Sequence, residues 1–517
     1  MANMPFRRRH HFIGVLAVML VVEPMTLWAQ TPSELEQLRS QIEALRRNDE
    51  EKQKQLDALE HEVNRLRKHA EAAAAAPTPP AGTATASSPQ DSKQAALDRA
   101  LEEVGGAPAT PQESLWSRPV GSGQIRLIDV SLDVLTAGGT STATDSEIHD
   151  LEGGAHDPNR RGFTLQQAEL SLSGAVDPYL MGEAHIVFTT GGAELEEAFF
   201  TTQSLPYDLQ IKAGYFLTEF GRMNPTHPHA WDWVDQPVIN SRMFGGDGLR
   251  APGARVSWLT PLPWYSSLDL GVQNANEGET TYSFIAEEGI GGRPPVYTHT
   301  ENLGDLLYSA RWSNAWNLTD ETTLALGVSG LHGPNVTGSD GQTWIYGSDM
   351  KLRWRPADNF RGWPFFLWQT EVMKRDYTAD WFVAGQETAT PDSGHNHNHG
   401  GGEEPEEEAP EEDLPGAILR DWGLYSQALY GFHHGWAGGL RLEYASGHGE
   451  SVGGRPADPF RDDRYRVSPL LVWQPTEYSR FRLQYNYDLT KFLNGNNASS
   501  VWIGGEILYG AHPAHQY

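Results

Sequence analysis

The sequence predicts an all-β fold, a transmembrane antiparallel β-barrel of about 16 strands, preceded by an N-terminal α-helical coiled coil. Two observations predict the barrel. Apolar and polar residues alternate strictly in short stretches between Gln124 and Tyr517, and the connections between these stretches are in turn short and long. A third observation agrees with them: beyond residue 29 no apolar run approaches the ~20 residues that a membrane-spanning helix needs.

The alternation is clear in residues 481–487, which read FRLQYNY. Successive side chains of a strand point to opposite faces, so a period of two indicates a strand. One face of this strand is aromatic and apolar, and the other carries Arg482, Gln484 and Asn486. A barrel in lipid turns its apolar face outward and its charged face toward a water-filled lumen.

Sixteen strands can be placed along the chain. We expect them to start near residues 124, 163, 179, 195, 208, 251, 265, 306, 321, 343, 363, 419, 436, 464, 477 and 499. Tight turns rich in Pro, Asn and Asp alternate with mostly long connections, such as 217–250 and 376–418. Short turns on the periplasmic side and long loops outside are typical of outer-membrane barrels.

Composition excludes several classes of protein. The formal net charge of the 517 residues is -29, which disfavours nucleic acid as a partner. The chain has no cysteine, which excludes disulfide frameworks and thiolate metal sites. No nucleophile elbow, phosphate-binding loop or HExxH motif is present, so we expect no enzyme activity.

Four regions follow from the sequence. Residues 1–29 combine a basic stretch, a short apolar run and a small residue at the cleavage site, as in a secretory signal peptide; a membrane anchor is the alternative. Residues 33–70 show an a/d heptad pattern and predict a periplasmic coiled coil, with a solitary solvated helix as the alternative. Residues 71–120 form a Pro/Ala/Ser-rich linker, and residues 121–517 form the barrel.

The polar faces of the strands predict which side chains line the lumen. A charged side chain at mid-membrane that faced lipid would cost roughly 2–4 kcal/mol, so we expect these charges to point inward. The predicted lumen-lining residues are Lys212, Arg255, Arg311, Lys351, Arg353, Arg441, Glu443, Arg464, Arg466, Arg480 and Arg482.

Two groups of histidines are candidate metal ligands. His395, His397 and His399 alternate in a long loop and precede a run of glutamates, and imidazoles so spaced can converge on Zn²⁺ or Cu²⁺. The alternative is a flexible, solvated loop of low complexity. His227 and His229 could bind a metal together with Asp232 or Asp235, but we favour a packed loop in which these histidines are hydrogen-bonded.

Two resemblances to known families follow from particular stretches. Residues 211–216 (IKAGYF) and 219–221 (EFG) resemble the phosphate-selective porin superfamily. The stretch 220–274, with NPTHPH at 224–229 and RMFGG at 242–246, and WQPTEYSR at 473–480 are similar to proteins described as zinc-regulated TonB-dependent outer-membrane receptors. The resemblance implies an outer-membrane barrel that takes part in transport.

These observations predict a porin-like channel of the Gram-negative outer membrane for passive uptake of small solutes, biased to divalent metal ions that the His/Glu-rich loop captures. The alternatives are a TonB-dependent metal receptor, a phosphate or anion porin, and a structural outer-membrane tether. No cofactor is required, and any bound zinc is weakly held. The expected partners are outer-membrane lipid, small ionic solutes and further copies of the chain, in a homo-oligomer, with a trimer favoured, through residues 35–70.

Overall fold

The computed structural model describes residues 117–120, 123–126, 128–296, 300–386, 388, 412–449, 451–452 and 458–510. The predicted signal peptide, the coiled coil and nearly all of the linker lie outside the described residues, as do His395, His397 and His399. Among the helices that are described, none has both the length and the apolar character needed to cross a membrane.

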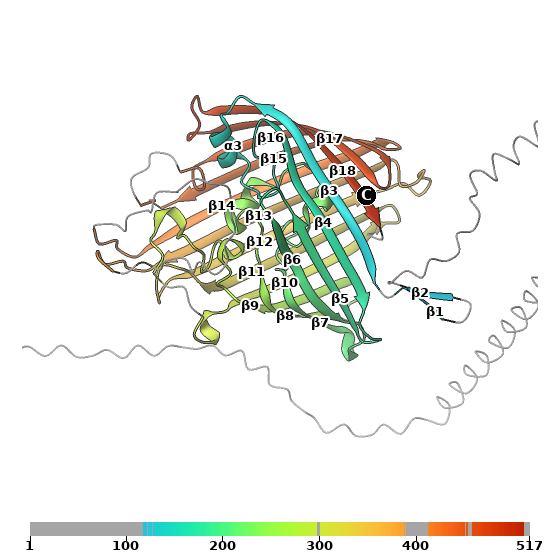
Figure 1. Cartoon of the computed structure of the whole chain (residues 1–517), viewed down its shortest axis with the longest axis horizontal. Coiled ribbons are helices and arrows are strands. Elements are labelled where there is room, and N and C mark those ends of the chain that lie inside the picture. Colours follow the sequence, from blue (N-terminus) through green and yellow to red (C-terminus); the bar gives the residue numbers. More distant parts are fainter. Residues whose placement is uncertain are drawn as a thin grey trace, which may run out of the picture. The chain divides into compact units, whose positions relative to one another are not determined.

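Sixteen antiparallel strands close into one barrel, which confirms the barrel part of the predicted fold class (Figure 1). Each strand pairs with the next one along the chain, and β18 pairs with β3 to close the circle, with Glu506 opposite Leu135. The strands are β3 (Asp129–Ser141), β4 (Gly162–Ala175), β5 (Leu180–Phe188), β6 (Ala193–Thr202), β7 (Leu209–Leu217), β8 (Arg250–Leu259), β9 (Tyr265–Gln273), β10 (Leu307–Thr319), β11 (Thr322–Pro334), β12 (Gln342–Trp354), β13 (Phe365–Ala379), β14 (Ala417–His433), β15 (Trp436–His448), β16 (Arg464–Thr476), β17 (Ser479–Thr490) and β18 (Asn497–Gly510). Closure pairs the backbone of every strand within the wall, as a barrel in hydrocarbon requires.

One strand start differs from the prediction. The first barrel strand begins at Asp129, whereas residues near 124 belong to a separate hairpin of β1 (Ser117–Val120) and β2 (Gly123–Arg126). The two short strands pair with each other over their full length, from Ser117 opposite Arg126 to Val120 opposite Gly123. Their hydrogen bonds are therefore made to each other rather than to the barrel wall.

The connections alternate as predicted. Short turns join β4 to β5, β6 to β7, β8 to β9 and so on around one end of the barrel, on the right in Figure 1. Most of the connections at the other end are longer, and the long ones include 142–161, 218–249 and 274–306. The helical turns that the structure describes lie in the connections: α3 (Asp145–Leu151), η1 (Pro206–Asp208), η2 (Pro228–Ala230), α4 (Val238–Phe244), η3 (Gly278–Thr281), η4 (Ile290–Gly292) and η5 (Leu303–Asp305).

The two faces of the wall differ as the alternation predicts. On β17, the exposed fractions of Phe481 and Leu483 are 38% and 47%, whereas Arg482 and Gln484 are 1% and 0% exposed. The same inside-outside alternation runs along β16 and β18. The polar face of these strands is therefore the inner one, and the apolar face covers the outside of the barrel.

Aromatic side chains cluster on the outer face near both ends of the strands. Trp436, Trp473 and Phe481 stack next to the short turns, with ring centroids 6.0 and 5.4 Å apart. Next to the long loops, Tyr444 contacts Trp422 and Tyr465, with centroids 5.1 and 4.6 Å apart. Two aromatic bands that flank an apolar strip are typical of a barrel that spans a bilayer.

The outer face gives a first testable prediction. Ile503 lies mid-way along β18 and is 59% exposed, so Ile503→Arg should place a charge in hydrocarbon and lower the free energy of unfolding by roughly 2–4 kcal/mol. The measurement is urea unfolding of the refolded barrel in lipid vesicles.

Leu303→Arg is the matched control, because Leu303 is 75% exposed in η5, outside the strands. It should leave the unfolding midpoint almost unchanged. Equal midpoints for the two variants would contradict a lipid-facing β18.

Candidate functional site

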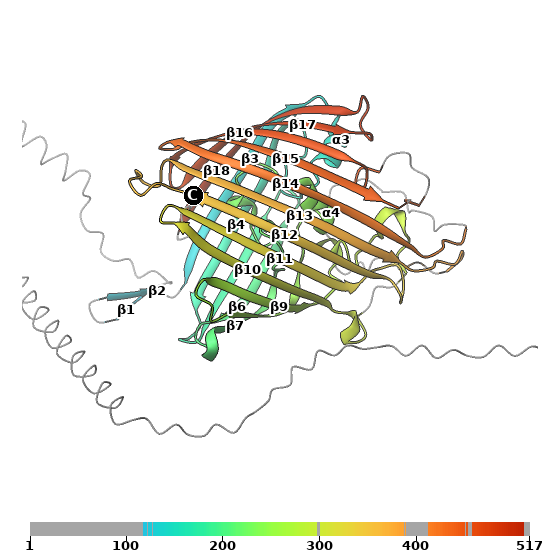
Figure 2. The ribbon, with the colours of Figure 1, turned by 180° about the vertical axis from the view of Figure 1, so that it is seen from behind.

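The connection 218–249 between β7 and β8 lies inside the barrel; we call it the inward segment. Its hydrogen bonds reach inward-facing atoms on strands all around the wall. The Met223 N–H donates to Glu371 of β13 (2.8 Å), the Val238 N–H to Glu443 of β15 (2.7 Å), and the Val234 N–H to Gln484 of β17 (2.8 Å). A segment that meets opposite walls at once can only cross the lumen, and Figure 2 shows its helix α4 within the outline of the strands.

Local sequence explains how the segment turns inward. The side-chain amide of Asn224 donates to the carbonyl oxygens of Thr218 (2.8 Å) and Leu249 (3.1 Å), and its oxygen accepts from the Leu249 N–H (2.8 Å). Asn224 therefore ties the two ends of the segment together. At the entry, Gly221 has a φ of 60°, and a Cβ there would lie 2.1 Å from a Glu371 carboxylate oxygen. Only glycine fits this turn without strain.

Apolar packing holds the part of the segment nearer the long loops. Phe220, Met243 and Phe244 are fully buried, and they join a cluster with wall residues such as Ile345 and Met373. The helix α4 packs against β13, β14 and β15. This cluster lies inside the barrel, where the strand alternation alone would place water.

Arginines of the wall hold the rest of the segment by its backbone. Arg480 donates to the carbonyl oxygen of His229 (2.5 Å), and Arg482 donates to those of Trp231 (3.0 Å) and Trp233 (2.9 Å). Both guanidinium groups also pair with Glu506 on β18. Two residues that the sequence places in the lumen are therefore buried against the segment, at 2% and 1% exposure.

Asp235 connects the segment to a second group of wall residues. Its carboxylate accepts from Arg441, Arg466 (2.9 Å), Gln484 (2.7 Å) and Asn486 (2.8 Å). Burial alone would raise the pKa of Asp235, but the two guanidinium groups hold it below its usual range. The carboxylate therefore has two arginines and two amide side chains as partners, all on the barrel wall.

The other predicted lumen residues take different positions. Arg311 pairs with Asp349 (2.7 Å), Arg464 with Asp488 (2.9 Å), Lys212 with Glu197 (3.4 Å) and Arg255 with Glu219, while Glu443 pairs with Arg441 (2.7 Å). Lys351 lines a cavity, and Arg353 is half-buried near the short-turn end of β12.

The histidines of the segment meet carboxylates of the wall. The Nδ1 atoms of three histidines face the Glu169 carboxylate on β4: His185 of β5 at 3.0 Å, His227 at 3.3 Å and His229 at 2.9 Å. His227 also lies 3.1 Å from Glu196 through Nδ1 and 2.8 Å from Glu197 through Nε2. We call these six residues the histidine cluster.

This geometry corrects one expectation and leaves another as a prediction. Asp235 does not accompany His227 and His229, because it is held by Arg441 and Arg466 on strands that face a different part of the segment. Asp232 lines a cavity on the far side of the segment from His185. The histidines are hydrogen-bonded, and their metal binding remains a prediction.

Sequence reasoning missed Glu169, Glu196 and Glu197. Glu169 alternates with Gln167 and Ser171 and could have been found on the inner face of β4. Glu196 and Glu197 are neighbours, yet both are buried, at 3% and 4% exposure. The ladder with β5 shifts register there, from His185 opposite Glu197 to Ile186 opposite Leu195, and such a bulge turns two consecutive side chains inward.

Electrostatics in the cluster depend on these carboxylates. Burial alone would lower the pKa of the His227 imidazole, but the charges of Glu196 and Glu169 raise it well above its usual range. In the described part of the chain, every ion pair of Glu169 and of Glu196 is made to a histidine and none to Lys or Arg. Within the cluster, histidines alone therefore pair with Glu169 and Glu196, whereas Glu197 also pairs with Lys212 (3.4 Å).

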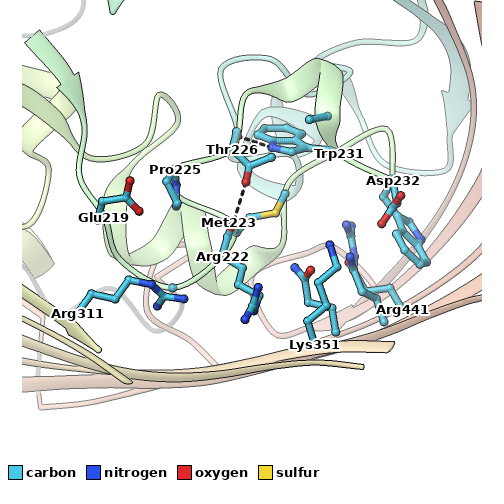
Figure 3. A pocket seen from close by; sticks show the side chains of 15 residues that line it. Glu219, Arg222, Met223, Pro225, Thr226, Trp231, Asp232, Arg311, Lys351 and Arg441 are labelled. Atoms are coloured by element: carbon cyan, nitrogen blue, oxygen red, sulfur yellow. Dashed lines mark hydrogen bonds between the residues drawn. The ribbon is translucent and has the colours of Figure 1, made fainter. Parts of the chain in front are cut away.

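Two cavities lie on either side of the inward segment and share Pro225, Thr226 and Ala230 in their walls. The first has a volume of about 290 Å³, and Figure 3 shows Arg311, Lys351 and Arg441 around it, opposite residues of the segment. The second, of about 530 Å³, is lined by strands β5 to β8 and opens onto His185, His227 and His229. Both offer water-sized space next to charged side chains.

Comparisons with known proteins add little to this geometry. No family model matches the chain. A protein of Aquifex aeolicus (strain VF5), described only as uncharacterised, is 28% identical over 407 residues, which cover 72% of this chain and 76% of that protein.

Among solved structures, the outer-membrane channel DcaP of Acinetobacter baumannii is 10% identical with a TM-score of 0.46, over 74% of this chain and 97% of that one. OmpT of Vibrio cholerae is 7% identical with a TM-score of 0.42, over 76% of this chain and 100% of that one. An anion-selective porin from Comamonas acidovorans is also 7% identical with a TM-score of 0.42, over 74% of this chain and 99% of that one. At these TM-scores we base no conclusion on the likeness.

The Asp235 network gives a second prediction. Asp235→Ala removes one acceptor from each of two buried guanidinium groups, Arg441 and Arg466, and breaking a buried ion pair by removing one partner costs roughly 3–5 kcal/mol. We expect the inward segment to loosen, so that protease cleaves within 225–236 in the folded barrel. The measurement is limited proteolysis in detergent with mass-spectrometric mapping of the cuts.

Asp232→Ala is the control, since Asp232 lies three residues away and is half-buried against the first cavity. It should leave the segment resistant to protease. Equal resistance of both variants would show that Asp235 does not hold the segment.

Proposed function

We propose that this protein is a porin-like channel of the outer membrane that passes small ionic solutes, and that the inward segment sets the width and the charge of the path. One observation carries the proposal: a closed barrel with an apolar outer face contains charged cavities on both sides of a segment that crosses its lumen. Water and ions can occupy such cavities, whereas lipid covers the outside. Transport rather than catalysis fits this arrangement.

Charge at the segment supports ionic solutes. Around the first cavity, Arg222, Arg311, Lys351 and Arg441 face the acidic residues Glu219 and Asp232. Charges of both signs across a narrow passage orient polar solutes and discriminate among ions. Neutral, bulky solutes are disfavoured, because the first cavity has a volume of only about 290 Å³.

An anion channel is the second candidate. The four cationic side chains around the first cavity outnumber the two acidic ones, which favours small anions on that side of the segment. The second cavity differs, because its two carboxylates, Glu183 and Glu197, are matched in number by Lys212 and Arg255, so cations are less disfavoured there. Which cavity carries the current decides between the two candidates.

Single-channel recording in planar bilayers tests the channel directly. The refolded full chain should give discrete current steps in potassium chloride. A protein that inserts into vesicles but conducts no ions would overturn the proposal.

Reversal potentials test the path. Lys351→Glu reverses one charge in the wall of the first cavity, so a channel that uses this cavity should shift its reversal potential in a salt gradient toward cations. Lys374→Glu is the matched control, because Lys374 is an exposed residue near the loop end of β13 that pairs with Asp376 (2.9 Å). Identical reversal potentials for wild type and Lys351→Glu would show that ions avoid the first cavity.

A further inference from the structure

We propose that the histidine cluster binds one divalent transition-metal ion, such as zinc, and that this ion locks the inward segment to the wall. The ligands of the site are Glu169, His185 and His227, with His229 and Glu196 within reach. Metal binding by the cluster does not depend on the proposed channel function, whereas the expected effect of the metal on ion current rests on that function.

Geometry is the first support. The candidate ligand atoms of Glu169, His185 and His227 all lie within 4.8 Å of one another. Adjacent donors are 3.0 Å apart for His185 and Glu169, 3.3 Å for His227 and Glu169, and 3.1 Å for His227 and Glu196. Ligands of a tetrahedral zinc ion at 2.0–2.1 Å lie about 3.3 Å from each other. Small side-chain movements would therefore admit the ion.

Charge is the second, independent support. Asp133 of β3 lies opposite Glu169 in the strand register, is 2% exposed, and neither of its carboxylate oxygens has a hydrogen-bond partner among the described residues. Together with Glu169 and Glu196 it places three buried carboxylates in one region without an ion pair to Lys or Arg. In the described strands and loops, histidines alone pair with Glu169 and Glu196, and a buried carboxylate without a hydrogen-bond partner, as at Asp133, is costly. A divalent cation would stabilise all three carboxylates.

Ligand type selects the class of metal. Imidazole nitrogens together with carboxylates suit zinc and neighbouring transition metals, whereas calcium and magnesium prefer all-oxygen sites. The site is also reachable, since His185, His227 and His229 line the 530 Å³ cavity. A hydrated ion could therefore exchange water for ligands without opening the wall.

The candidate ligands come from both the barrel wall and the inward segment. Glu169, His185 and Glu196 belong to β4, β5 and β6, while His227 precedes η2 of the inward segment and His229 lies within it. An ion bound across this boundary would cross-link the segment to the wall. Pro225, Thr226 and Ala230, which both cavities share, lie within the same stretch. Metal occupancy would thus restrict the part of the inward segment that lines both cavities.

Zinc titration by calorimetry on the detergent-solubilised full chain tests the site. The experiment starts from the triple variant His395→Gln, His397→Gln, His399→Gln, so that the acidic loop does not contribute histidines. We expect one zinc ion per chain. X-ray absorption should show nitrogen and oxygen neighbours at about 2.0–2.1 Å.

Variants in the triple background identify the ligands. Glu169→Gln keeps the shape and hydrogen-bonding capacity of the side chain but removes its charge, and it should weaken zinc binding at least tenfold, as should His185→Gln and His227→Gln. His434→Gln, at an exposed turn between β14 and β15, should bind zinc as the triple variant does. Heat-modifiable gel migration verifies that each barrel is folded.

Two results would overturn the site. One is the absence of a stoichiometric zinc ion in the folded triple variant, which would mean that the cluster is a hydrogen-bonded network without a metal. The other is unchanged affinity in Glu169→Gln and His227→Gln. Either result leaves the proposed channel standing, because neither measures current.

Hydrogen exchange and current recording test the lock. Zinc should slow exchange of backbone N–H groups in 223–234 and reduce single-channel conductance, and a chelator should reverse both, with no effect in Glu169→Gln. Zinc that binds but changes neither quantity would overturn the lock. If no current is seen at all, the proposed channel fails, and hydrogen exchange still decides whether the ion holds the segment.

Discussion

Buried guanidinium groups on the inner wall are the constraint on which the interior depends. Arg441, Arg466, Arg480 and Arg482 are at most 2% exposed, and a charge so deeply buried must be paired and hydrogen-bonded. The barrel wall supplies Glu506, Glu443 and Asp488, but these carboxylates do not occupy every donor. The carbonyl oxygens of His229, Trp231 and Trp233 and the carboxylate of Asp235 accept further hydrogen bonds from them. The inward segment is therefore part of the charge balance of the wall.

The same contacts determine the chemistry on the other side of the segment. Residues 229–235 are held by β15, β16 and β17, and this leaves His227 and His229 facing Glu169, Glu196 and Glu197 on β4 and β6. A shift of the segment would alter the histidine cluster and both cavities together, because the three share residues 225–230. The position of residues 225–230 therefore affects both the shape of the two cavities and the arrangement of the candidate metal ligands.

Most of the wall could be predicted from the sequence, and much of the site could not. Strand starts such as 265, 436 and 464 agree with the structure, because alternation is a local property that each strand displays by itself. Asp235, offered as one possible partner of the histidines, does not lie with them, because Arg441 and Arg466 on distant strands bind it. Nearness in sequence alone could not reveal these contacts. Glu196 and Glu197 were missed, because a bulge interrupts the alternation on which the prediction relies.

The sequence by itself determined the sixteen strands, the order of short and long connections, and the apolar outer face. Each of these features follows from a local pattern, either the alternation of side chains two residues apart or the residue types of a short turn. Only the tertiary structure decided that 218–249 crosses the lumen, that Glu169 meets three histidines, and that Arg480 and Arg482 bind the backbone of the inward segment. The physical reason is that these contacts join residues such as Trp231 and Arg482, which come together only after the barrel has closed and its buried charges have found partners.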